Sequence, residues 1–203
     1  MTGVSPTLRT TRVHRGQCAA AVVAALLLCT SIGGAQDVTE PSLKAAFIYN
    51  FAKFTEWPQG TLPATAPFNA CVLGVNASAG TGASASASPI QVALERTVKG
   101  RQFAGRQISV VQMRIDGQLR SCHLLYLSGV TLAQLAAVLE AVRGAPVLTV
   151  SDVDDFARRG GIAQMFVEDG KMRFELNLEA AKRSGLELSS KLLVLAAEVY
   201  GGR

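Results

Sequence analysis

Few side chains in this sequence have the type and spacing that catalysis requires. His123 is the only histidine after residue 35, so a Ser-His-Asp triad would depend on it, and histidine-based zinc sites would have too few ligands. Cys122 directly precedes it, which suggests a Cys-His dyad. Neighbouring residues of a strand point to opposite faces, however, so the thiol and the imidazole would not meet. We therefore expect no catalytic residues.

The acidic and glycine-rich segments predict no metal or cofactor site either. Asp152, Asp154 and Asp155 lie close together but lack the glycine and terminal glutamate of a calcium loop. They fit better as a helix cap, Asp152, followed by first-turn charges of a short helix over 153–158. The Gly/Ala/Ser-rich segment 76–89 has none of the usual phosphate-loop spacings. We expect it to be a low-complexity loop.

Arg173 and Glu175 are the candidates for ligand binding. They stand two residues apart in "MRFELN", so they share one face of a predicted strand. An exposed, salt-bridged face is the simpler interpretation. The alternative is the polar lip of a pocket in which arginine binds a carboxylate.

The segment "LKAAFIYNFAKFTEWP", residues 43–58, is the candidate for partner recognition. It holds five aromatic rings in a chain that is only 6% aromatic. It is too short and too polar for a membrane anchor. The spacing predicts a core-facing stripe of Leu43, Phe47, Phe51 and Phe54. Tyr49, Lys53 and Trp57 fall off this stripe, and exposed residues of these types are common in protein interfaces.

The first 35 residues have the layout of a secretory signal peptide. Three arginines precede a twelve-residue apolar run, residues 18–29, and small residues follow up to Ala35. Cleavage after Ala35 predicts an exported chain that begins at Gln36. Without the three leader arginines, 17 of the 20 basic residues remain against 15 acidic ones, a net charge of +2. This small charge and the absence of Lys/Arg runs argue against a nucleic-acid partner.

Two cysteines, Cys71 and Cys122, remain after removal of the leader. In an oxidising compartment two cysteines predict one disulfide bond. Neither belongs to a CxxC pair, which argues against a zinc site or a thioredoxin-like redox motif.

The remaining pattern predicts one α/β domain: a mostly parallel sheet with an antiparallel edge hairpin, flanked by helices. The hairpin spans 162–178 and turns at Asp169-Gly170. The other strands are predicted at 68–75, 106–113, 122–128 and 146–151, and the helices at 42–54, 90–98, 131–144, 153–158 and 189–200. The last is expected to close the domain with a stripe of Leu192, Leu195, Ala196, Val199 and Tyr200.

Six phrases in this order resemble the YfiR family: "LKAAFIYNFAKFTEWP", "FNACVLG", "GRQISV", "SCHLLYLS", "VLTVSDVDDFARRGG" and "MRFELNLEAAKRSGLELSSKLLVLA". The resemblance covers about residues 41–200. It implies a periplasmic protein that binds and represses an inner-membrane receptor, either a diguanylate cyclase (YfiN) or a histidine kinase sensor domain. Repression of the cyclase lowers cyclic di-GMP and disfavours biofilm. An outer-membrane lipoprotein (YfiB) as a second partner, a homodimer, and pairing of Cys71 with Cys122 are also implied.

This chain departs from the family pattern in two places. Some members carry a second cysteine pair near 146–165, whereas Val147 to Val167 holds no cysteine. The loop 76–89 also stands where other members have a shorter turn. The leading hypothesis is a non-enzymatic regulator without a cofactor. The alternative is a periplasmic module that senses an aromatic or carboxylate ligand, and an exported enzyme comes third.

Overall fold

The computed structural model describes residue 3 and residues 39–62, 65–74 and 87–202. The predicted leader, apart from residue 3, and most of the predicted loop 76–89 lie outside these residues. The helices are α2 (Glu40–Lys53), α3 (Pro89–Val98), α4 (Leu132–Ala141), α5 (Leu178–Arg183) and α6 (Ser190–Leu195), with a 3-10 turn, η2, at Leu119–Ser121. Within the described residues, no helix has the length and apolar character needed to cross a membrane.

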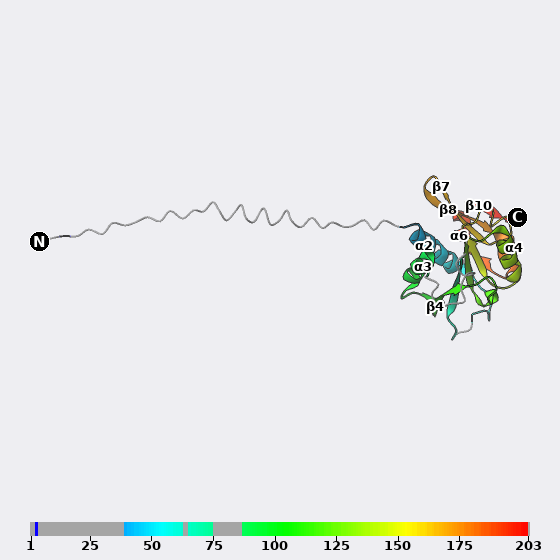
Figure 1. Ribbon diagram of the computed structural model, residues 1–203, viewed down its shortest axis with the longest axis horizontal. Helices are drawn as coiled ribbons and strands as arrows, with labels where there is room; N and C mark the ends of the chain where they lie inside the picture. The colour runs from blue at the N-terminus through cyan, green and yellow to red at the C-terminus, as the bar shows by residue number, and fades with distance from the viewer. Residues whose placement is uncertain (1–2, 4–38, 63–64, 75–86, 203) are drawn as a thin grey trace. The chain divides into compact units, whose positions relative to one another are not determined.

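The strands among these residues form one large sheet and a two-stranded one. The large sheet has the order β10-β8-β7-β6-β5-β2-β4-β3. Its strands β10, β8, β7 and β4 are labelled in Figure 1. Its strands are β2 (Phe68–Gly74), β3 (Gln102–Phe103), β4 (Arg106–Met113), β5 (Leu124–Ser128), β6 (Leu148–Ser151), β7 (Ala163–Glu168), β8 (Lys171–Asn177) and β10 (Glu198–Tyr200). The small sheet pairs β1 (Thr55–Glu56) with β9 (Glu187–Leu188).

Pairing directions confirm the predicted fold class. The pairs β4-β2, β2-β5, β5-β6 and β6-β7 are parallel. β8 turns back antiparallel to β7 as the predicted hairpin, with Asp169 and Gly170 both at positive φ in its turn. The helix between β2 and β4 and the helix between β5 and β6 supply the crossovers that parallel strands require.

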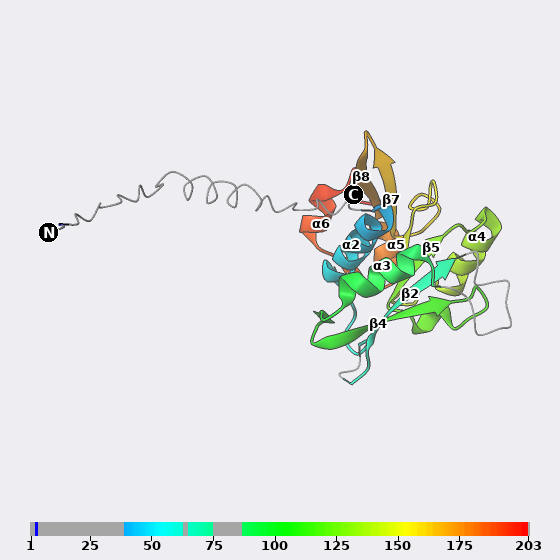
Figure 2. The same ribbon diagram turned by 60° about the vertical axis from the view of Figure 1, so that its left-hand side comes forward.

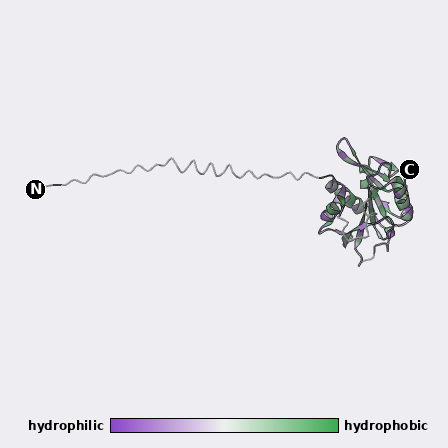
Figure 3. Ribbon diagram, in the orientation of Figure 1, coloured by the Kyte–Doolittle hydropathy of each residue, from purple (hydrophilic) through white to green (hydrophobic). Residues whose placement is uncertain are grey.

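Successive residues of the parallel strands point to opposite faces of the sheet and therefore contribute to two hydrophobic cores. One core lies against α2 and α3, and the other lies against α4. The first receives Ala70, Val72, Leu124 and Tyr126, and the second receives Cys71, Leu73, Leu125 and Leu127. Figure 3 shows hydrophobic residues along the strands at the centre of the domain.

The predicted closing helix is only half correct. α6 ends at Leu195, and Glu198 to Tyr200 instead form β10, which pairs parallel with β8. The predicted stripe is therefore broken: Leu192 is buried, whereas Leu195 is 68% exposed. Backbone pairing with an open sheet edge outweighs the helical pattern of the last residues, because β-branched and aromatic residues such as Val199 and Tyr200 also suit a strand.

The predicted helix 153–158 is wrong, since the segment 153–160 forms successive bends and turns. Asp152 is not a helix cap: its carboxylate accepts from Lys44 and Tyr126, and the Val153 N–H is bound by the Ser151 hydroxyl. The segment folds tightly over the buried Phe156 ring, which occupies the space of a side chain at Gly161: a Cβ there would lie 2.1 Å from Phe156 Cε1. The predicted strand 122–128 also begins later, at Leu124.

Candidate partner-binding surface

Tyr49 and Lys53 lie one turn apart on α2. Tyr49 is half-buried, and the guanidinium of Arg101 lies 4.9 Å from the centre of its ring. Lys53 is exposed, and its ammonium lies 5.8 Å from the ring of Phe54. A cation over an aromatic face is a weak attraction at an exposed site. Lys53 is thus on the surface, whereas Tyr49 packs in part against the first hydrophobic core.

Trp57 makes contacts of a structural kind. Its indole N–H donates to the Pro146 carbonyl at 2.9 Å. Its ring meets those of Phe68 and Phe103 edge to face, each with centroids 5.2 Å apart. Such aromatic pairs stabilise a fold beyond their buried area. The structure therefore does not present Trp57 as a free side chain beside Tyr49 and Lys53.

Arg173 and Glu175 of β8 have different neighbours. Arg173 pairs across the hairpin with Glu168, at 3.7 Å. Glu175 accepts a hydrogen bond of 3.0 Å from the hydroxyl of Tyr200 on the other side of the strand. Each side chain thus has a local surface partner.

Cys71 and Cys122 form the predicted disulfide bond, with Cα atoms 5.8 Å apart. Cys71 lies in β2, and Cys122 lies just before the neighbouring strand β5. The adjacent His123 serves the backbone: its Nδ1 accepts from the Asn69 N–H at 2.9 Å, and its ring stacks on Phe68. Burial lowers the pKa of His123. The imidazole is therefore a neutral acceptor that joins β2 to the start of β5.

A half-buried ionic network links α2 to the carboxyl ends of β5 and β6. Lys44 Nζ lies 2.6 Å from Asp152 Oδ2 and 2.6 Å from Glu40 Oε1. The Tyr126 hydroxyl donates to the same Asp152 oxygen at 3.0 Å. Burial and the charge of Asp152 raise the pKa of Tyr126. Burial lowers the pKa of Lys44, but its hydrogen bonds to Asp152 and Glu40 outweigh this effect and raise it.

The side chains of Lys44 and Asp152 are both largely withdrawn from water, so solvent weakens their ion pair little. The pair therefore holds α2 against the sheet. Sequence reasoning missed it, since Lys44 and Asp152 are 108 residues apart and no local pattern joins them. Among the described residues no cluster of three metal-ligating side chains occurs.

An exposed apolar surface lies at the C-terminal edge of the sheet. Val194 and Leu195 of α6 are 83% and 68% exposed. Leu193 beside them lines an open hollow of about 540 Å³ together with Leu178, Val199, Tyr200, Gly201 and Gly202. We call Leu178, Leu193, Val194, Leu195, Val199 and Tyr200 the α6/β10 surface. Figure 2 shows α6 beside β8 near the C-terminus.

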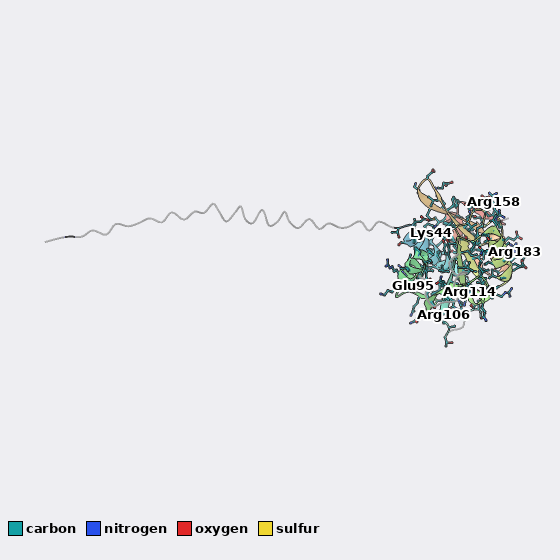
Figure 4. The ribbon with its side chains drawn as sticks, viewed as in Figure 1. Lys44, Glu95, Arg106, Arg114, Arg158 and Arg183 are labelled. Atoms are coloured by element: carbon teal, nitrogen blue, oxygen red, sulfur yellow. A yellow bond between two sulfur atoms is a disulfide. The ribbon has the colours of Figure 1, made fainter. Side chains whose placement is uncertain are left out.

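Charged groups border this surface at β10, the edge strand of the sheet. Arg158 donates to the Tyr200 hydroxyl at 2.9 Å and lies 3.4 Å from Glu198. The single Tyr200 hydroxyl proton lies within reach of two carboxylates, Glu198 at 2.8 Å and Glu175 at 3.0 Å, and can be donated to one of them at a time. Desolvation and the hydrogen bond to Glu198 raise the pKa of Tyr200 to about 12. Arg158 is labelled in Figure 4.

A signal for this surface is present in the sequence. The run "LLVLAA", residues 192–197, is apolar on every side. A short helix with no polar face must expose part of its apolar surface unless it is buried all round. Interpreting the run as a core stripe overlooked this consequence.

Comparison with known proteins places the chain in a family. The profile of a family described as YfiR/HmsC-like matches residues 41–197. No curated protein sequence matches the chain. Among solved structures it is similar to a conserved domain protein from Vibrio cholerae O1 biovar El Tor, with a TM-score of 0.51 and 12% identity.

That alignment covers 79% of this chain and 60% of the Vibrio protein, so the chain spans less than two thirds of the length of this structural relative. At this identity the likeness concerns the fold alone. The family profile, in contrast, covers the large sheet from β3 to β8, both helical layers and the Leu178, Leu193, Val194 and Leu195 side chains of the α6/β10 surface, and it ends just before β10. This chain belongs to the YfiR/HmsC-like family.

Proposed function

We propose that the protein is a periplasmic regulator that binds the sensor domain of an inner-membrane diguanylate cyclase and represses it, which lowers cyclic di-GMP. The observation that carries the proposal is the α6/β10 surface, on which Val194 and Leu195 project from a short helix beside the sheet edge. Exposed apolar residues grouped at one place, with a polar rim, are typical of protein interaction sites.

The α6/β10 surface offers two kinds of contact. Burial of an exposed Val or Leu side chain contributes about 1.5–3 kcal/mol. The outer edge of β10 can also donate and accept main-chain hydrogen bonds, so a strand of the receptor could extend the sheet. The Arg158–Glu198 pair beside it would fix the register of such a strand.

Repression follows from a difference in affinity. A regulator shifts a receptor towards its inactive form only if it binds that form more tightly than the active one. A hundredfold difference corresponds to about 2.7 kcal/mol. That amount is within the contribution of Val194 and Leu195, if these two side chains are buried only against the inactive receptor.

The proposed periplasmic location is supported by two independent features. The leader predicted from residues 1–35 would direct export. The disulfide between Cys71 and Cys122 is a bond that persists in oxidising compartments and is rare in the cytosol.

The test is a pull-down from detergent-solubilised inner membranes with the purified protein, followed by mass spectrometry and a cyclase assay with the captured receptor. The key variant is Leu195→Asp. The matched control is Leu132→Asp, because Leu132 is 55% exposed on α4, which packs on the other core.

We expect Leu195→Asp to weaken repression at least tenfold and Leu132→Asp to leave it unchanged. Equal loss in both variants would refute the assignment of the surface. Capture of a histidine kinase in place of a cyclase would refute the cyclase and keep the surface. Sedimentation of the purified protein, with and without Leu195→Asp, determines whether the proposed homodimer uses the same residues. Capture of an outer-membrane lipoprotein would identify the second proposed partner.

A further inference from the structure

Three arginines from separate segments line one small pocket, which shares no lining residue with the α6/β10 surface. Arg143 follows α4, Arg159 lies in the turn segment 153–160, and Arg183 ends α5. The pocket has a volume of about 130 Å³. Its other lining residues include the apolar side chains Leu139, Val142, Ile162 and Ala180, and the hydroxyl-bearing Thr149 and Ser184. Arg183 is labelled in Figure 4.

The lining combines an apolar floor with a cationic rim. Val142, Ile162 and Ala180 are buried and form a mostly apolar floor together with the buried Thr149, whereas all three arginines are exposed. The Thr149 hydroxyl accepts a hydrogen bond from the Ile162 N–H at 3.0 Å, which holds β6 to the chain that follows the turn segment. A ligand that matches this pocket has a short apolar body and a negative end.

Each arginine has one acidic neighbour in its own segment. Arg143 lies 2.6 Å from Glu140, and Arg183 lies 2.6 Å from Glu179. Arg159 lies 4.0 Å from Asp155. All six side chains are between 47% and 72% exposed. Exposed ion pairs are weak, and a guanidinium has five N–H donors. Each arginine can therefore keep its neighbour and still donate to a ligand.

A structural alternative exists for two of the three arginines. Arg143 and Arg183 stand at helix C-termini, where basic side chains offset the negative end of the helix dipole. That explanation does not cover Arg159, which belongs to no helix. It also does not account for the convergence of all three on one cavity with an apolar floor.

The size of the pocket limits the ligand. A cavity of about 150 Å³ accommodates benzene, so this slightly smaller pocket suits a molecule of similar size. Arginine binds carboxylates and phosphates through paired N–H donors. The apolar floor favours the carboxylate, because a phosphate ion has no apolar part to bury there.

We propose that this pocket binds a short-chain organic carboxylate, with its apolar body on the floor and its carboxylate among Arg143, Arg159 and Arg183. The inference is independent of the proposed receptor. Its ligand class matches one considered from the sequence, but the site is this pocket and not Arg173 with Glu175.

The experiment is isothermal titration calorimetry of the purified protein with butyrate, succinate and inorganic phosphate, at constant ionic strength and pH. The test variants are Arg159→Gln and Arg183→Gln. The control is Arg114→Gln, because Arg114 is also exposed and also paired, at 3.0 Å, with a nearby carboxylate, Asp116, but does not line the pocket. All these side chains are exposed, so the variants are expected to fold.

We expect butyrate or succinate to bind. Each test variant should raise the dissociation constant at least tenfold, since a hydrogen bond to a charged group is lost. Arg114→Gln should bind as the unaltered protein does. No heat with either carboxylate, or equal weakening in the control, would overturn the proposal. Binding of phosphate alone would overturn the carboxylate assignment.

Discussion

Reduction of the disulfide is expected to destabilise the domain strongly. The two cysteines are separated by 51 residues. Closing a loop of that length lowers the entropy of the unfolded chain enough to stabilise the fold by about 4 kcal/mol. Whole domains of this kind are stable by only about 5–15 kcal/mol. For a domain of this size the loss corresponds to a decrease of about 8–16 °C in melting temperature.

The structure indicates why the effect should come mainly from the cross-link. Cys71 and Cys122 are both buried within the core against α4, so reduction leaves two thiols in place and creates no cavity. The bond ties β2 to the start of β5, two strands that are already neighbours in the sheet. Reduction should therefore change the unfolded chain more than the native contacts.

The assay is thermal and urea unfolding with and without a phosphine reductant, with site-resolved thiol labelling by mass spectrometry. The double variant Cys71→Ala/Cys122→Ala is the control: it should resemble the reduced protein and be insensitive to reductant. Melting temperatures of oxidised and reduced protein within about 2 °C of each other would refute the reasoning, given the slope used above. Labelling of both thiols before reduction would refute the bond itself.

Three further predictions concern packing and charge. Trp57→Ala should lower the free energy of unfolding by about 3 kcal/mol in urea titration; a loss below about 1 kcal/mol together with lost receptor binding would restore Trp57 as a recognition residue. Burial lowers the pKa of His123 below its ordinary 6.5, so the unfolded chain takes up the proton first and stability should fall as pH drops through and below that value. Between pH 8 and 5 the melting temperature should therefore depend less on pH in His123→Asn than in the unaltered protein. An unchanged pH dependence would contradict the assignment. Asp152→Ala should cost about 1–3 kcal/mol because Lys44 and Tyr126 lose their shared acceptor, and in a double-mutant cycle with Lys44→Met the two losses should not add; strict additivity would show that the pair is not coupled.

Near-continuous apolar runs made the central strands of the sheet predictable from the sequence. In β2, β5 and β6 nearly every residue is buried, which is the pattern of strands covered on both faces. The hairpin was equally clear, because Asp-Gly stands between two apolar runs. Prediction failed where one local pattern suits two structures. Residues 198–200 continue a helical stripe, yet the open edge of β8 selects a strand.

The candidate sites were less predictable, because their residues meet only through tertiary packing. Trp57 falls off the helical stripe and was therefore assigned to the surface, but the helix ends before it and its ring turns towards Phe68 and Phe103. Lys44 and Asp152 are in contact although 108 residues separate them in the sequence. In both cases the periodicity of one element predicted which of its own residues face the core. It did not predict contacts made by residues beyond the end of that element.

The three pocket arginines show the same limit in a sharper form. In the sequence each has an acidic residue three or four positions away, and such a pair is sufficient to explain an exposed arginine on a local turn or helix. Convergence requires the end of α4, the turn segment and α5 to lie around one cavity, and this arrangement depends on the order of β6, β7 and β8 in the sheet. A local ion pair and a shared binding pocket are therefore compatible descriptions of the same side chains. Only a measurement that compares these arginines with an equally paired arginine elsewhere, Arg114, separates the two.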